Sequence, residues 1–114
     1  MPWRLEWRPR FTPSPLTYWV HGATVPAPTA RGYPWVVVER RGHCLGFASA
    51  DELRHAIGVL SRRVLPRPSA LAGPPHGHAN QHWLSRFPTD LRSWRVRTAL
   101  VAELRDALAA LVDG

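Results

Sequence analysis

Apolar and polar residues alternate along the first segment of the chain. Residues 3–8 read Trp-Arg-Leu-Glu-Trp-Arg, so an extended segment would have one apolar and one charged face. This period of two predicts a half-buried strand. The segment from Leu16 to Val20, which is rich in ring and branched side chains, predicts a second strand. The prolines between these strands predict an extended surface loop, because each lacks an N–H and fixes its own φ.

Two further strands are predicted later in the chain, over 35–39 and 43–48. The first contains three consecutive valines, and Arg40-Arg41-Gly42 between the two strands is a turn signal. These features are typical of a β-hairpin, here with a basic tip. A long connection rich in proline and glycine, residues 23–34, precedes it.

The clearest helical signal follows the hairpin. Ser49 and Glu52 have the spacing of a capping box, in which the serine hydroxyl accepts from the N–H of Glu52 and the glutamate reaches back to the N–H of Ser49. Apolar residues then recur every three to four positions from Leu53 to Val64, which predicts an amphipathic helix. We expect it to end near Arg63, because two prolines follow.

The C-terminal third predicts two helices after a linker. A short helix over 79–87 is stopped by Pro88, and a longer one over roughly 90–112 is capped by Thr89 or Ser93. We expect the two to form an antiparallel hairpin. The alternative is a helix-turn-helix, whose second helix would carry its arginines near its N-terminal end, where recognition helices contact bases.

The element order predicts one α+β domain over 1–114. A small antiparallel sheet of about four strands would carry a capped helix and a C-terminal helical hairpin on one face. In order along the chain, the predicted parts are strands and Pro-rich loops over 1–48, a helix over 49–65, a Pro/Gly linker over 66–78 and the helical hairpin over 79–114.

Composition narrows the class of protein. The chain has 114 residues and a net charge of +7, and all 15 basic residues are arginine. No apolar run approaches the roughly 20 residues that span a bilayer, and the N-terminal segment lacks the apolar stretch of a signal peptide. Cys44 is the single cysteine, so an internal disulfide is impossible. We therefore expect a cytoplasmic protein without membrane contact.

Candidate catalytic and metal-binding residues are few. His76, His78 and His82 have the spacing H-x-H-x-x-x-H, but they lie in or beside the Pro/Gly linker. We therefore interpret them as histidines of a solvated loop, and a small metal-dependent enzyme is the remote alternative. His43 and Cys44 are neighbours on a predicted strand, so they point to opposite faces and form no dyad; Cys44 is expected to be a half-buried structural thiol. We expect no catalytic residue, no metal and no cofactor.

The arginines indicate a polyanionic partner. Guanidinium groups bind phosphates, and aromatic rings stack on bases. Arginines and tryptophans are interleaved in the C-terminal third, and a basic pair lies at the hairpin tip. The nucleic-acid-binding residues we predict are Arg40, Arg41, Arg86, Arg92, Arg95 and Arg97 for phosphate contact, with Trp83 and Trp94 for stacking.

Four segments carry a resemblance to other proteins. Residues 80–88 read NQHWLSRFP and are followed by SWRVR at 93–97; YWVHG at 18–22 and the segment 47–60 complete the pattern. These segments resemble small uncharacterised proteins of bacterial plasmids, integrative elements and prophages. The resemblance implies a mobile genetic element as the setting, and it implies no activity.

The leading hypothesis is a non-enzymatic module that binds nucleic acid or a ribonucleoprotein. The alternative is a protein-binding inhibitor or accessory factor that acts on a host defence complex and uses exposed tryptophan and arginine as contacts. A homodimer is also possible, because the strand over 3–8 could leave an open edge for a second copy.

Overall fold

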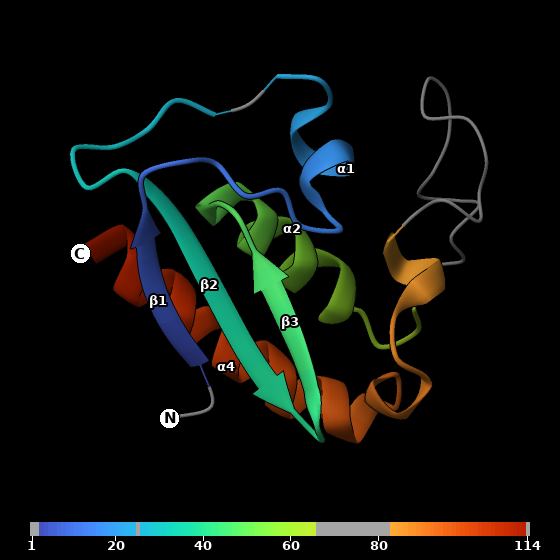
Figure 1. Cartoon of the computed structure of the whole chain (residues 1–114). Coiled ribbons are helices and arrows are strands. Elements are labelled where there is room, and N and C mark those ends of the chain that lie inside the picture. The colour runs from blue at the N-terminus through green and yellow to red at the C-terminus, as the bar shows by residue number, and fades with distance from the viewer. Residues whose placement is uncertain (1–2, 25, 66–82, 114) are drawn as a thin grey trace.

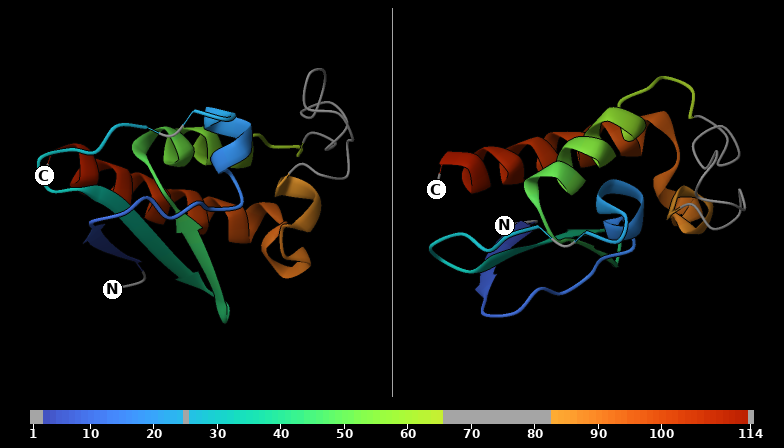
Figure 2. Two further views of the ribbon diagram at one scale, coloured as in Figure 1. Left: turned by 45° about the horizontal axis from the view of Figure 1, so that its top comes forward. Right: turned by 90° about the horizontal axis from the view of Figure 1, so that it is seen from above.

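The computed structural model describes residues 3–24, 26–65 and 83–113. These residues form an α+β structure with a three-stranded antiparallel sheet of order β1-β2-β3. The strands are β1 (Trp3–Arg8), β2 (Tyr33–Arg40) and β3 (His43–Phe47). The helices are α1 (Thr17–His21), α2 (Ala50–Leu60) and α4 (Trp94–Asp113), with the short 3-10 helices η2 (Trp83–Arg86) and η3 (Thr89–Leu91). Helices α2 and α4 lie side by side over one face of the sheet (Figures 1 and 2).

The period of two decides which side chains face the helices. Leu5 pairs with Val36, and Val36 with Phe47, so all three point to the helical face. Arg4 and Glu6 point to the opposite face, where the segment 9–15 crosses and Phe11 contacts Tyr33 edge to face at 5.7 Å. The alternation predicted for β1 is therefore confirmed.

The predicted β2–β3 hairpin is also confirmed, with β2 starting two residues earlier than expected. The loop residues Arg41 and Gly42 have φ values of 51° and 81°. Two positive φ values in a two-residue loop define a type I′ turn, whose twist matches that of the flanking strands. Arg40 and His43 form the closing pair of the hairpin.

The strand predicted over Leu16–Val20 is wrong, because this segment forms the short helix α1. The backbone N–H of Leu16 donates to Ser14 Oγ at 3.1 Å, and the N–H of Thr17 donates to the Ser14 carbonyl at 3.1 Å, which turns the chain into a helix. Gly22, with a φ of 63°, ends it. The sheet consequently has three strands in the described part of the chain, not four.

Helix α2 begins where the capping signal predicts and ends earlier than expected. Ser49 Oγ accepts from the N–H of Glu52 at 3.2 Å, as a capping box requires. The reciprocal bond is absent: Glu52 accepts instead from the N–H of Ala48 at 2.9 Å. The helix stops at Leu60 rather than near Arg63, and the side chain of Arg97 binds the carbonyls that follow the break.

The predicted helical hairpin over 79–114 is not confirmed. Within residues 83–91 the chain forms two 3-10 helices rather than an α-helix, so neither that hairpin nor a helix-turn-helix is present there. Helix α4 begins at Trp94, and Ser93 rather than Thr89 precedes its first turn, with its hydroxyl accepting from the N–H of Val96 at 3.4 Å. The linker 66–78 lies outside the described residues.

The core lies between the helical face of the sheet and helices α2 and α4. Its fully buried members are large aliphatic side chains, which contribute about 1.5–3 kcal/mol each on burial. They are Val36, Val38, Leu53, Leu60, Leu84, Leu91, Leu100 and Leu104. In the part of the chain that the structure describes, none of the helices has the length and apolar character needed to cross a bilayer.

Candidate functional site

The two arginines predicted at the hairpin tip are paired with carboxylates. Arg40 forms an ion pair with Glu103 of α4, and Arg41 lies 3.6 Å from Asp90. His43 Nε2 is 2.8 Å from the other oxygen of Asp90. These contacts join the hairpin to α4 and η3, and they neutralise much of the charge that a phosphate would meet there.

Two other predicted arginines bind backbone carbonyls. The guanidinium of Arg92 donates to the carbonyls of Phe87 and Leu84 at 3.0–3.1 Å. Arg97, whose side chain is on α4, is 3 % exposed and donates to the carbonyls of Leu60, Arg62, Arg63 and Arg92. Arg97 therefore supplies hydrogen-bond donors to the carbonyl of Leu60, the last residue of α2, and to the carbonyls of Arg62 and Arg63 just after the helix.

Of the two predicted stacking residues, Trp83 is buried. Its Nε1–H donates to His55 Nε2 at 2.9 Å, and its ring contacts Phe87 edge to face. Burial lowers the pKa of His55, although the nearby charge of Glu52 opposes this effect. A neutral His55 accepting from Trp83 fits that direction, because a charged ring would have no free lone pair.

Trp94 is 37 % exposed and lies among arginines at the junction of two helices. The guanidinium carbon of Arg63 is 5.0 Å from the ring centroid, and that of Arg97 is 5.2 Å. Arg62 and Arg95 are exposed beside them in sequence. We call Arg62, Arg63, Trp94 and Arg95 the basic corner; it lies where α2 ends and α4 begins.

The electrostatics of the basic corner favour an anion. Arg62, Arg63 and Arg95 form no ion pair with a carboxylate in the described part of the chain, and the first turn of α4 holds no acidic residue. Burial lowers the pKa of Arg97, and the charge of Arg63 lowers it further. Like charges thus lie close together without a carboxylate between them, which concentrates positive potential at one surface.

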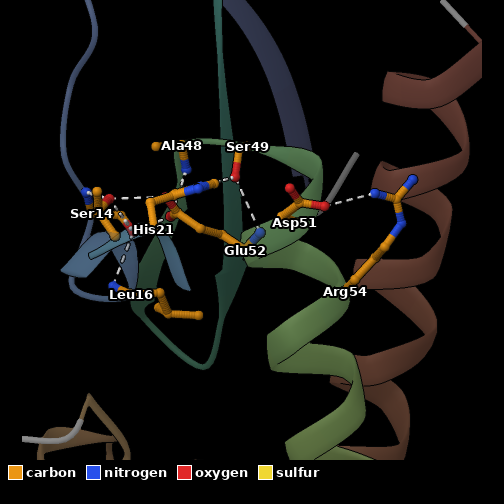
Figure 3. A network of polar contacts seen from close by, with 9 residues as sticks. Ser14, Leu16, His21, Ala48, Ser49, Asp51, Glu52 and Arg54 are labelled. Atoms are coloured by element: carbon orange, nitrogen blue, oxygen red, sulfur yellow. Dashed lines mark hydrogen bonds and ion pairs between the residues drawn. The ribbon is translucent and has the colours of Figure 1, made fainter. Parts of the chain in front are cut away.

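A second polar cluster surrounds Glu52, whose side chain is fully buried (Figure 3). Its carboxylate accepts from the hydroxyls of Ser14 and Thr17 and from the backbone N–H of Ala48. His21 Nε2 lies 2.8 Å from Ser49 Oγ and 3.6 Å from Glu52 Oε2. These bonds connect α1 and the chain before it to the N-terminus of α2.

The same cluster has the residue types of a catalytic triad but not its geometry. In a triad the carboxylate binds one ring nitrogen of histidine and the hydroxyl binds the other. Here Ser49 and Glu52 both approach Nε2 of His21. The Ser49 hydroxyl is also buried and caps α2. The arrangement therefore holds two segments together and provides no relay to a nucleophile.

The remaining residues considered in the sequence analysis are one cysteine and three histidines. Cys44 is exposed, so the prediction of a half-buried thiol is wrong; its Sγ lies 3.9 Å from Glu39 Oε1 on the neighbouring strand. His76, His78 and His82 lie outside the described residues. Among the residues that are described, no group of three or more His, Cys, Asp or Glu side chains could hold a metal.

Sequence reasoning missed two features. It did not include Arg62 and Arg63 among the predicted contact residues, because only the tertiary structure brings Arg63, after the end of α2, against Trp94 at the start of α4. It also gave Glu52 a purely local role, while the Ser14-x-x-Thr17 pattern held its hydroxyl partners. No family model, curated protein or solved structure matches this chain.

Proposed function

We propose that the protein is a non-enzymatic nucleic-acid-binding module whose contact surface is the basic corner. The observation that carries this proposal is the contact of exposed Arg63 with the partly exposed ring of Trp94, flanked in sequence by the exposed Arg62 and Arg95; none of the three arginines is paired with a described carboxylate. Guanidinium groups neutralise backbone phosphates, and an accessible ring stacks on an unpaired base. The corner thus combines both kinds of contact that a single strand requires.

The basic corner contains only some of the nucleic-acid-binding residues predicted from the sequence. It retains Arg95 and Trp94 and adds Arg62 and Arg63. Arg40, Arg41, Arg92 and Arg97 have partners inside the protein, so their guanidinium groups are less available to phosphate. A cytoplasmic location and a mobile-element setting accompany the proposal; they follow from the composition and from the resemblance described above.

The experiment compares two triple variants that remove the same charge. R62Q/R63Q/R95Q removes the corner arginines, whereas R10Q/R31Q/R105Q removes three exposed arginines elsewhere. Binding of fluorescein-labelled 20-nucleotide single-stranded DNA, single-stranded RNA and duplex DNA is measured by anisotropy between 50 and 200 mM salt. Because each phosphate contact adds about −0.7 to −0.9 to the log–log salt slope, the corner variant should lose about two from the wild-type slope.

Each outcome decides the proposal. A loss of slope and affinity in the corner variant, with a change of less than one in the matched variant, supports the corner as the contact surface. Equal losses in both variants would mean that net charge alone attracts the nucleic acid. Absence of binding to all three probes at 50 mM salt would reject a nucleic-acid-binding function and favour a protein partner.

A further inference from the structure

A pocket of about 320 Å³ lies along the free edge of β3, away from the basic corner residues. Four consecutive residues of this strand, Cys44 to Phe47, line it. Successive side chains of a strand point to opposite faces of the sheet. Four consecutive residues can therefore line the same pocket only if the pocket runs along the edge of the strand. In the described sheet β2 occupies the other side of β3, so the pocket lies on the outer edge.

The wall opposite the strand is apolar. Side chains from the chain before α1, from α2 and from η2 with the residues after it contribute to it, among them Leu16, Leu60, Trp83 and Phe87. Trp35 completes it from the outer face of the sheet, where its ring lies against Gly46. The size and apolar lining are those of small ligand and peptide pockets.

The edge of β3 also offers unused backbone groups. In a hairpin with a two-residue type I′ loop, the pair next to the loop is joined by backbone hydrogen bonds; here this pair is Arg40 and His43. From His43 onward, every second residue of β3 therefore forms backbone hydrogen bonds with β2. The N–H and C=O groups of Cys44 and Gly46 consequently point away from β2. No described residue bonds to them. Such an edge is a template for an additional strand.

One charged group lies at the pocket. Arg86 is exposed, lines the pocket and forms no ion pair with a described carboxylate. No aspartate or glutamate is among the described lining residues. An occupant therefore meets an apolar wall, an open strand edge and a single positive charge.

We infer that this edge binds an extended peptide of a partner protein that carries an apolar side chain and, close to it, a carboxylate. The peptide adds a strand to β3 through the backbone of Cys44 and Gly46, as in other cases of β-strand addition. One of its side chains enters the pocket, and its carboxylate pairs with Arg86. This inference concerns a surface separate from the basic corner and does not depend on nucleic-acid binding.

Two pairs of variants separate the backbone and charge contributions. C44P removes the outward N–H without removing a bond to β2, because proline is tolerated where an edge N–H points outward. C44S keeps that N–H and a side chain of similar size. R86Q removes the charge at the pocket, and R105Q removes the same charge from an exposed position of α4 as its control. Far-UV circular dichroism checks that each variant is folded.

The probe is a displayed library of random 12-residue peptides, selected on the full-length wild-type chain. We expect enriched peptides with alternating apolar residues and an aspartate or glutamate at a fixed offset. The best of them should bind C44P and R86Q at least tenfold more weakly, and C44S and R105Q within twofold of wild type. Hydrogen exchange at the amides of Cys44 and Gly46 should slow when the peptide is bound.

Three results would overturn the inference. Selection could yield no enriched peptide, or the enriched peptides could bind C44P as well as they bind C44S. Alternatively, size-exclusion chromatography with light scattering could show a wild-type dimer that C44P converts to monomers. That last result would assign the edge to a second copy of this chain instead of a partner peptide.

Discussion

Replacing Arg97 by methionine removes the side chain that binds the end of α2. Its guanidinium donates to four carbonyls, and the bond to Leu60 is fully buried. A buried hydrogen bond from a charged donor is worth about 1.5–3 kcal/mol. The other three bonds are partly buried, so water can bind these carbonyls in the variant. We therefore expect each of these bonds to contribute about 0.5–1 kcal/mol to the free energy of unfolding. The expected destabilisation of R97M is therefore about 4 kcal/mol.

Lysine at position 97 tests whether charge or geometry matters. An ammonium group has three donors and no planar fork, so it cannot reach all four carbonyls. We expect R97K to lose about 2 kcal/mol, which is half of the loss in R97M. The matched control is R95M, because Arg95 lies on the same helix but is exposed; its effect should stay within about 0.5 kcal/mol.

The assay is equilibrium urea unfolding followed by far-UV circular dichroism. Tryptophan fluorescence is less suitable, because the ring of Trp94 contacts Arg97 directly. A loss of 4 kcal/mol corresponds to a fall in Tm of about 15 °C for a domain of this size. A loss below about 1 kcal/mol in R97M would refute the reasoning, and so would an equal loss in R95M.

Three further predictions concern the corner, the histidine under Trp83 and the buried carboxylate. W94L should weaken binding of single-stranded DNA about tenfold in the anisotropy assay while W94F retains most of it, because base stacking on a ring contributes about 1–3 kcal/mol; equal losses would exclude stacking. The lowered pKa of His55 means that the unfolded chain takes up a proton more readily, so the free energy of unfolding should be constant above about pH 7.5 and decrease as the pH falls through about 6.5. H55Q, whose amide oxygen can still accept from Trp83, should lose this contribution in urea titrations at pH 5–8, and an unchanged pH dependence would contradict it. E52Q should destabilise the protein by about 2–4 kcal/mol in the same urea assay, because an NH2 group replaces one of the two oxygens that accept from Ser14 and Thr17; a loss below 1 kcal/mol would contradict the importance of these bonds.

The candidate site shows why residue type alone did not identify the contact surface. The guanidinium of arginine can donate to phosphate, carboxylate or backbone carbonyl oxygens, so its sequence position does not say which of these it binds. Arg95 and Arg97 are two residues apart on α4, yet one is exposed and the other is almost fully buried. On a helix that spacing turns the second side chain toward the opposite face, where α2 ends.

The sequence by itself determined the elements whose signals are local. The alternation in residues 3–8 defined β1, the Arg41-Gly42 pair defined the β2–β3 turn, and Ser49 defined the start of α2. Each of these signals involves neighbours within about four residues, so it acts before any tertiary contact forms. The alternation also restricts strand pairing, because a shift of the register by one residue would move the apolar side chains away from the helical face.

Only the tertiary structure decided the remaining features, because their partners lie far apart in the chain. Helix α1 is joined to α2 by the Thr17 hydroxyl, which donates to Glu52, 35 residues away. Arg97 lost its availability to ligands through carbonyls 34–37 residues away. Local propensity contributes only tenths of a kcal/mol per residue, whereas burying a carboxylate or a guanidinium without partners costs several. The distant contacts therefore override the local signals wherever a charge is buried.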